Sequence, residues 1–264
     1  MRKNIFNIVA ITACLVVAYL VYYLWLGSPA NFEVGPAGEV LKHAPKNVMG
    51  MVFTGGPLVG LLISFLLISI TFIVERVLSL KKAQGKGVPE KFIKNVILSL
   101  EKGDLVAAEK FCDEQRGSIA NVLRAAINRF KEIENDTDYS ADKKLAEVQR
   151  SIDEAMNLET PLLEKNLVII STIASVSVLV GLLGTTLGMI RSFAALAKSD
   201  AGVSAKQLSA GISEALYNTA GGLASAIICI IAYNFFTTKV DNFVYMIDES
   251  ILSIMEIFTI RIKK

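Results

Sequence analysis

Charged residues are absent from four long, strongly hydrophobic stretches of the chain. These stretches cover residues 4–32, 47–74, 166–190 and 215–238. Each is longer than the roughly 20 residues with which an apolar helix crosses a hydrocarbon core about 30 Å thick. A charge at the bilayer centre costs at least about 2.5–3.5 kcal/mol, so the shared absence of charges indicates membrane spans. The pattern therefore predicts an all-α integral membrane protein with four transmembrane helices.

Between the second and third spans the pattern changes to that of amphipathic helices. Apolar residues recur there at steps of three and four, as in Phe92, Val96, Ile97 and Leu100. Asp104 and Ser118 each follow a glycine and are predicted to be helix N-caps. From Ser140 the helical pattern continues into the third span, and we expect Pro161 to kink it just before the membrane.

These patterns divide the chain into five segments. In order, they are an N-terminal transmembrane helix with an external loop (1–54), a second transmembrane helix (55–80), a cytoplasmic helical domain (81–165), the last two transmembrane helices with a short external link (166–238) and a cytoplasmic C-terminal helix extension (239–264). We expect residues 27–54 to form a loop with some surface-lying helix. Glu75 and Arg76 are expected to lie in the headgroup region, in contact with water.

Basic residues set the orientation of the spans. Lys81, Lys82 and Lys86 directly follow the second span, whereas only Lys42 and Lys46 precede it. Loops on the cytoplasmic side of a membrane carry an excess of Lys and Arg. We therefore place the N-terminus and the long polar segment after the second span in the cytoplasm.

The first span has two interpretations. Its basic start, its apolar run and the small residues at 28–30 resemble a secretory signal with a cleavage site. However, the run of about 22 residues exceeds the 7–15 usual for a signal. Its outer end also carries an aromatic cluster typical of a membrane interface, formed by Tyr19, Tyr22, Tyr23 and Trp25. We favour a retained helix, and a cleaved signal is the alternative.

Composition argues against several classes of function. The net charge is only +2 and no basic stripe is present, so we expect no nucleic-acid partner. One histidine, His43, which we expect in a solvated loop, and three scattered cysteines do not form a zinc motif. The chain also lacks a phosphate-binding loop and a nucleophile elbow. We therefore predict neither an enzyme nor a cofactor.

The last two spans carry stripes of small and polar residues at helical spacing. One stripe lies in the third span and consists of Ser177, Gly181, Gly184 and Gly188. The other lies in the fourth span and consists of Gly211, Glu214, Asn218, Gly222 and Ser225. Thr185 and Thr219 lie on adjoining faces. Two hypotheses fit such stripes, namely close packing of the two helices and a polar lining for the passage of ions.

A proton path through these helices would need a titratable group from elsewhere. Residues 166–190 and 215–238 contain no ionisable Asp, Glu, His, Lys or Arg, and Glu214 lies only at the outer edge of its span. If the chain conducts protons, the titrating carboxylate must therefore belong to another chain. The sequence thus calls for a partner subunit.

Two sequence motifs resemble those of a known family. Gly181-Leu182-Leu183-Gly184-Thr185, followed by Gly188-Met189-Ile190-Arg191-Ser192-Phe193, is similar to the third-helix motif of the ExbB/TolQ/MotA proton-channel family. The segment 211–223, which begins Gly-Ile-Ser-Glu-Ala-Leu, and Tyr233-Asn234 are similar to its final helix. The residues of this second motif favour the ExbB/TolQ branch of the family. The resemblance covers roughly residues 50–264 and is strongest over 160–240.

This resemblance implies a specific assembly. It implies a homopentamer in the inner membrane of a Gram-negative cell, around single-span ExbD/TolR-like subunits that carry a membrane aspartate. Proton flow would drive a motor or stator whose work reaches the outer membrane through a TonB- or TolA-like protein. Thr185 and Thr219 would line the proton path, with Glu214 near its outer end. The chain departs from the family at Ile228, where a proline is usual, and at Arg191, where a neutral polar residue is common.

Other functions remain as alternatives. A passive multispan scaffold, in which the stripes serve only packing, is the main one. A stand-alone secondary transporter would show an inverted repeat and broken helices, and neither is evident in the sequence. The choice between a TonB-type and a Tol-type partner system, and between protons and sodium ions, is left open.

Overall fold

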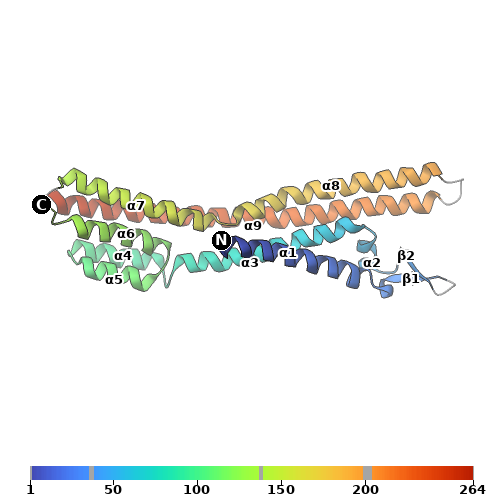
Figure 1. Cartoon of the computed structure of the whole chain (residues 1–264), viewed down its shortest axis with the longest axis horizontal. Helices are drawn as coiled ribbons and strands as arrows, with labels where there is room; N and C mark the ends of the chain where they lie inside the picture. Colours follow the sequence, from blue (N-terminus) through green and yellow to red (C-terminus); the bar gives the residue numbers. More distant parts are fainter. Residues whose placement is uncertain (1, 36–38, 137–138, 199–203, 264) are drawn as a thin grey trace. The chain divides into compact units, whose positions relative to one another are not determined.

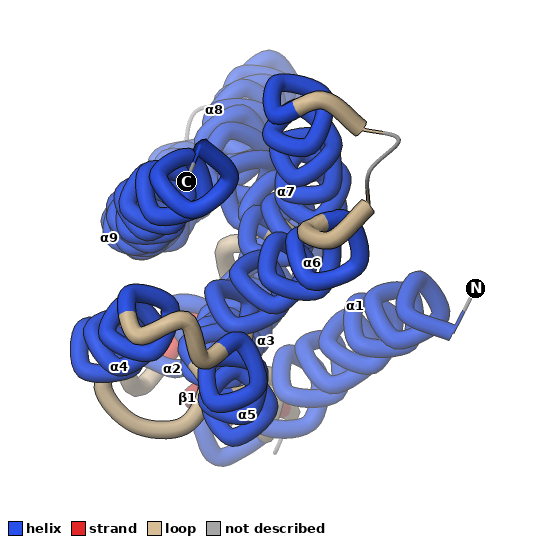
Figure 2. The backbone as a smooth tube through the Cα atoms, turned by 90° about the vertical axis from the view of Figure 1, so that its left-hand side faces the viewer, coloured by secondary structure: helices blue, strands red, loops and turns tan. Residues whose placement is uncertain are grey.

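The computed structural model describes residues 2–35, 39–136, 139–198 and 204–263 and is built almost entirely of helices. The described strands form one two-stranded sheet, and helices make up most of the tube in Figure 2. Figure 1 shows the elements in chain order, and the helices are α1 (Arg2–Leu20), the π-helix η1 (Val21–Leu26), the 3₁₀ helix η2 (Pro29–Asn31), α2 (Val48–Phe53), α3 (Pro57–Gln84), α4 (Pro89–Glu101), α5 (Leu105–Gln115), α6 (Ser118–Ile133), α7 (Ala141–Glu164), α8 (Leu167–Lys198) and α9 (Ser204–Lys263).

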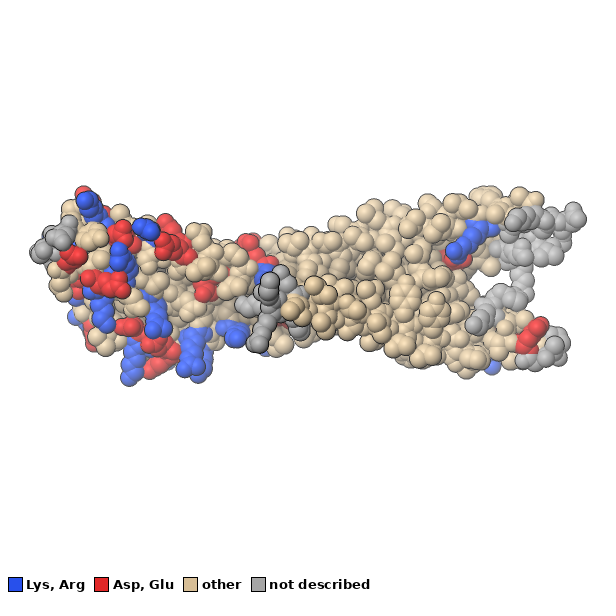
Figure 3. Space-filling view, in the orientation of Figure 1, with Lys and Arg blue, Asp and Glu red and all other residues tan. Residues whose placement is uncertain are grey.

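Within this described part, four helical segments are long and apolar enough to cross a membrane. Each of them overlaps one of the four stretches without charge, so the predicted all-α membrane architecture is confirmed. The chain forms two compact units, of which the first comprises residues 1–74 and 168–234 and the second residues 75–167 and 235–264. On the face seen in Figure 3, charged side chains gather over the second unit, while most of the surface of the first carries none.

The segment after the first span is a folded hairpin and not the expected loop. Strands β1 (Phe32–Val34) and β2 (Val40–Pro45) pair antiparallel. Asn31 anchors the segment, because its amide nitrogen donates to the carbonyl oxygens of Trp25 (2.7 Å) and Leu26 (3.0 Å) and its amide oxygen accepts from Asn47 (2.9 Å). The short helix α2 follows. The side chain of His43 lies outside the described residues.

In the second unit, α4 to α7 pack with the C-terminal part of α9 around one hydrophobic core. The predicted apolar positions Phe92, Val96 and Leu100 are buried in it. The rings of Phe130 on α6 and Phe258 on α9 stack with their centroids 4.0 Å apart and their planes 5° from parallel. The amphipathic pattern of the polar segment therefore predicted the buried faces of these helices correctly.

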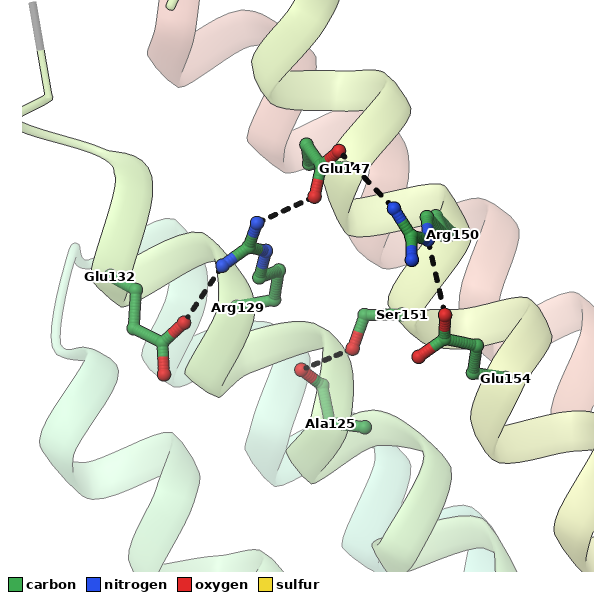
Figure 4. A network of polar contacts seen from close by, with 7 residues as sticks. All are labelled: Ala125, Arg129, Glu132, Glu147, Arg150, Ser151 and Glu154. Carbon is green, nitrogen blue, oxygen red and sulfur yellow. Dashed lines mark hydrogen bonds and ion pairs between the residues drawn. The ribbon is translucent and has the colours of Figure 1, made fainter.

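Polar contacts tie α6 to α7 at the surface of this core (Figure 4). Arg129 on α6 bonds to Glu132 on its own helix and to Glu147 on α7. The hydroxyl of Ser151 donates to the main-chain oxygen of Ala125 over 3.3 Å. These contacts satisfy polar groups at the edge of the core, and the interleaved charges of this segment form a solvated surface as their pattern predicts.

Two predicted helix boundaries differ from the structure and one agrees with it. The Asp104 side chain caps α5 by accepting from the main-chain nitrogen of Ala107 at 2.9 Å, as predicted. Ser118, in contrast, is the first residue of α6, and Gly117 is its N-cap. Helix α7 continues through Pro161 and ends at Glu164, so the expected uninterrupted run into the third span is wrong. The break falls at Asn166, whose φ of 64° lies in the left-handed region that asparagine tolerates better than most residues.

Arg76 is not in contact with water, contrary to the expectation from sequence. Its side chain is 0% exposed. It bonds to both carboxylate oxygens of Glu75 at 2.8 Å and donates to the main-chain oxygen of Leu163 at 3.1 Å. The amide of Asn166 donates to Glu75 at 3.0 Å. A buried guanidinium needs such partners, and here they are the adjacent Glu75 and the main chain of Leu163 in the last turn of α7.

Candidate functional site

Helices α8 and α9 meet along a buried contact that we call the α8/α9 seam. The structure brings to it all eight small or polar residues singled out for packing, namely Ser177, Gly181, Gly184, Gly188, Gly211, Asn218, Gly222 and Ser225. Each of them is buried within the first unit. The stripes of the last two spans therefore face one another.

Glycine is required where the two main chains touch. A β-carbon added at Gly222 would lie 2.6 Å from the main-chain oxygen of Ser177 and 2.9 Å from the α-carbon of Gly181. One added at Gly188 would lie 2.9 Å from both the side chain of Ala215 and the main-chain oxygen of Gly211. Such close approach of backbones is the role that small residues play between transmembrane helices.

The two threonines of the proposed path lie beside this seam, both half-buried. The Thr219 hydroxyl donates across the seam to the main-chain oxygen of Gly181 at 3.3 Å. The Thr185 hydroxyl donates to the main-chain oxygen of Leu182 in its own helix at 2.6 Å. A hydroxyl that donates to a carbonyl still offers its lone pairs as acceptors. Each threonine therefore presents an acceptor site in a part of the helices that has no charge.

Glu214 lies at one end of the seam and pairs with Arg191 of α8. The carboxylate is mostly covered, with 17% of its side chain exposed, whereas 57% of the Arg191 side chain is exposed. The loop before α3 also closes over Glu214. A β-carbon at Gly56, whose φ is 80°, would lie 2.7 Å from a Glu214 carboxylate oxygen. Sequence reasoning flagged Arg191 as a departure but found neither this ion pair nor the role of Gly56.

Asn218 links the same loop to the seam. Its amide nitrogen donates to the main-chain oxygen of Gly55 at 2.7 Å and to that of Glu214 at 3.0 Å. Its amide oxygen is buried and has no partner within the described part of the chain, and the same holds for the hydroxyl of Ser177. Buried polar atoms are nearly always satisfied. These two atoms are therefore the polar groups of the seam whose hydrogen bonds the described residues do not supply.

Other side chains of the first unit connect its helices. Among the described residues, no group of three or more His, Cys, Asp or Glu side chains could hold a metal ion. Cys229 contacts the hydroxyl of Ser69 at 2.8 Å and links α9 to α3. Along the α8/α9 seam, the polar groups are hydroxyls, an amide and the carboxylate of Glu214 paired with the guanidinium of Arg191.

Comparison with known proteins identifies the family to which these helices belong. The model of the MotA/TolQ/ExbB proton channel family matches residues 114–249, just over half of the chain, including the whole α8/α9 seam. The chain belongs to this family. The resemblance seen in the motifs of the last two spans is thereby confirmed, and the described helices are those of a membrane channel protein.

Individual relatives in the family carry TolQ and ExbB names. The chain is 34% identical to "Tol-Pal system protein TolQ" of Pseudomonas aeruginosa over 121 residues, which is 46% of this chain and 52% of the relative. It is 46% identical to "Biopolymer transport protein ExbB" of Helicobacter pylori over 88 residues, 33% of this chain and 58% of the relative. The chain thus spans about half the length of these curated relatives. A "Putative biopolymer transport protein ExbB homolog" of Methanothermobacter thermautotrophicus is 25% identical over 197 residues, 74% of this chain and 64% of the relative.

Proposed function

We propose that this chain is the proton-channel subunit of an inner-membrane motor or stator complex in a Gram-negative cell. The complex uses the proton-motive force and passes the work to outer-membrane processes through a TonB- or TolA-like protein. Membership of the family supports the channel function, and relatives named TolQ and ExbB support a Tol- or Ton-type system. The finer steps rest on the chemistry of the α8/α9 seam.

The observation that carries the proposal is a polar seam whose membrane core lacks acidic and basic side chains. Hydroxyls and an amide lie along α8 and α9, but residues 166–190 and 215–238 contain no Asp, Glu, His, Lys or Arg. Proton relays in membranes use Asp, Glu or His. The missing group must therefore be supplied by another subunit, for which a single-span ExbD/TolR-like protein with a membrane aspartate is the fitting partner. Several copies of this chain, five by family resemblance, would surround it.

The named residues then have distinct roles. Thr185 and Thr219 accept hydrogen bonds from the protonated partner carboxyl or from water on its way to it. Glu214, paired with Arg191, fixes the outer end of the path. One proton that falls through about 100 mV releases about 2.3 kcal/mol. Work on an outer-membrane protein thus needs several protons in succession, which favours a stepping motor.

Hydroxyl-deletion variants in the native host test this proposal. Thr185→Val and Thr219→Val keep the side-chain shape and remove the hydroxyl. Thr186→Val is the matched control, because Thr186 is exposed and its hydroxyl donates to Leu183 in the same manner as that of Thr185 to Leu182. Uptake of an iron chelate reports a TonB-type system, and growth in the presence of bile detergent reports a Tol-type system.

We expect Thr185→Val and Thr219→Val to reduce one of these two readouts about tenfold or more, in line with the loss of a group that takes part in proton transfer. Membrane levels and co-purification of the partner should stay at wild-type values, as should the activity of Thr186→Val. Full activity of both variants in both assays would show that the hydroxyls serve only packing. That outcome would favour the passive scaffold, for which the glycine contacts of the seam are the supporting observation.

A further inference from the structure

A small groove in the second unit combines apolar walls with two lysines. It has a volume of about 120 Å³ and lies between the C-terminal part of α3 and the part of α9 that begins at Phe235. Its apolar wall includes Val77, Leu80, Phe236 and Phe243, and the lysines are Lys81 and Lys239. We call it the lysine groove.

The positive charge of the lysine groove is not neutralised. No Asp or Glu is among the residues that line it. Across the described ranges of the chain, neither Lys81 nor Lys239 takes part in an ion pair. The ammonium of Lys239 instead lies 4.9 Å from the centre of the Phe235 ring, a cation–π contact. Both lysines are exposed and free to meet an anion.

The place of these lysines along their helices corresponds to the surface of the membrane. Lys239 is the first charged residue after the charge-free stretch 215–238 of α9, and on α3 Lys81 is the first lysine after the second such stretch, about two turns beyond residue 74 and after Glu75 and Arg76. Phe235, which lines the groove, is 54% exposed although apolar. Apolar side chains next to lysines at the end of a span match the boundary between acyl chains and phosphates on the cytoplasmic side.

We propose that the lysine groove binds an anionic phospholipid of the cytoplasmic leaflet. Lys81 and Lys239 hold the phosphate, and the first part of an acyl chain lies against Val77, Leu80 and Phe243. A free phosphate would use only the lysines and leave the apolar wall in water. The combined apolar and cationic lining therefore favours a lipid. This site is separate from the α8/α9 seam and does not depend on proton conduction.

Lipid titration of the purified full-length protein, followed by native mass spectrometry, tests the proposal. The probes are phosphatidylglycerol, zwitterionic phosphatidylcholine and glycerol 3-phosphate. We expect tighter binding of phosphatidylglycerol than of phosphatidylcholine, and no competition by glycerol 3-phosphate at equal concentration. Lys81→Gln/Lys239→Gln should bind phosphatidylglycerol about 10- to 30-fold more weakly, because each lysine near an anionic surface contributes roughly a fivefold step.

Two further variants separate a defined site from general attraction. Lys91→Gln/Lys94→Gln removes the same charge from exposed positions on α4 outside the groove and should bind as wild type does. Lys81→Arg/Lys239→Arg should retain binding, because it keeps both positive charges at the groove. Equal binding of the two lipids by the wild-type protein would overturn the proposal. An equal loss in both glutamine variants, unchanged binding in Lys81→Gln/Lys239→Gln or loss of binding in the arginine variant would overturn it as well.

Discussion

The guanidinium of Arg191 on α8 pairs with the carboxylate of Glu214 on α9. This pair joins the two channel helices at the end of their seam, close to the loop that carries Gly55 and Gly56. Arg191 places a positive charge within a segment apolar enough to cross a membrane. Its cost in the membrane is limited, because the charge is both paired and largely exposed. Arg191 therefore adds a link between α8 and α9 without adding a buried charge.

Reversal of this pair should show its contribution to stability. Arg191→Glu places two carboxylates together and should lower the free energy of unfolding of the solubilised protein by about 1 kcal/mol, the upper range for an exposed pair. Glu214→Arg should do the same, and the double swap should recover most of the loss. Thermal melting in detergent measures this. If the double variant is as unstable as the sum of the two single ones, the pair makes no contribution.

Adjacent glycines on α9 offer a matched test of the seam. Gly222→Ala should lower the free energy of unfolding by about 1–3 kcal/mol, because the new methyl group meets the backbone of α8. Gly221→Ala should be neutral or slightly stabilising, since a β-carbon there makes an ordinary contact at 3.4 Å with Leu62. Melting temperature and membrane level report both. Equal effects of the two substitutions would contradict the close backbone contact.

The contact of Arg129 with Glu147 predicts a dependence of stability on pH. The hydrogen bond from Arg129 lowers the pKa of Glu147 below its ordinary value of 4.5. The stabilisation is therefore complete above that value and is lost as the pH falls below it. The melting temperature of the wild-type protein should exceed that of Glu147→Gln at pH 7, and this difference should shrink towards pH 3.5. Glu154→Gln, which removes an exposed partner of Arg150, is the control. A pH-independent difference for Glu147→Gln would contradict this linkage.

Burial should make Cys112 unreactive in the folded protein. Desolvation raises the pKa of its thiol to about 12, so little thiolate is present at pH 8. In a Cys14→Ala/Cys229→Ala background we expect alkylation roughly 100-fold slower than that of an introduced cysteine at exposed position 110, and full labelling after denaturation. Mass spectrometry of timed iodoacetamide reactions measures both rates. Rapid alkylation of the folded protein would show that the core around Cys112 opens readily.

The spans and the seam could be predicted from the sequence because their causes are local and periodic. Absence of charge marks a span wherever it occurs along the chain. Glycines and serines at steps of three and four define a helix face without knowledge of the partner helix. For the same reason the amphipathic pattern identified Phe92 and Val96 as core residues.

Contacts between distant parts of the chain could not be predicted in this way. The bond from Asn218 to Gly55 joins positions 163 residues apart, and no periodicity reports such a pairing. The bond from Arg76 to the main-chain oxygen of Leu163 likewise joins positions 87 residues apart. The break at Asn166, where a left-handed residue interrupts an otherwise continuous helical pattern, was not evident either. The pairing of Glu214 with Arg191 likewise depends on how α8 and α9 align, which neither helix encodes alone.

The glycine contacts of the seam have a consequence for the gene as well as for the protein. Every missense change of a glycine codon introduces a residue with a β-carbon, and at Gly181, Gly188 and Gly222 that atom would press on the main chain of the facing helix. Most hydrophobic positions of a membrane helix tolerate conservative replacement, but these three glycines do not. Sequence changes in α8 and α9 should therefore accumulate on the sides that face lipid or partner subunits, while the glycines of the seam stay unchanged.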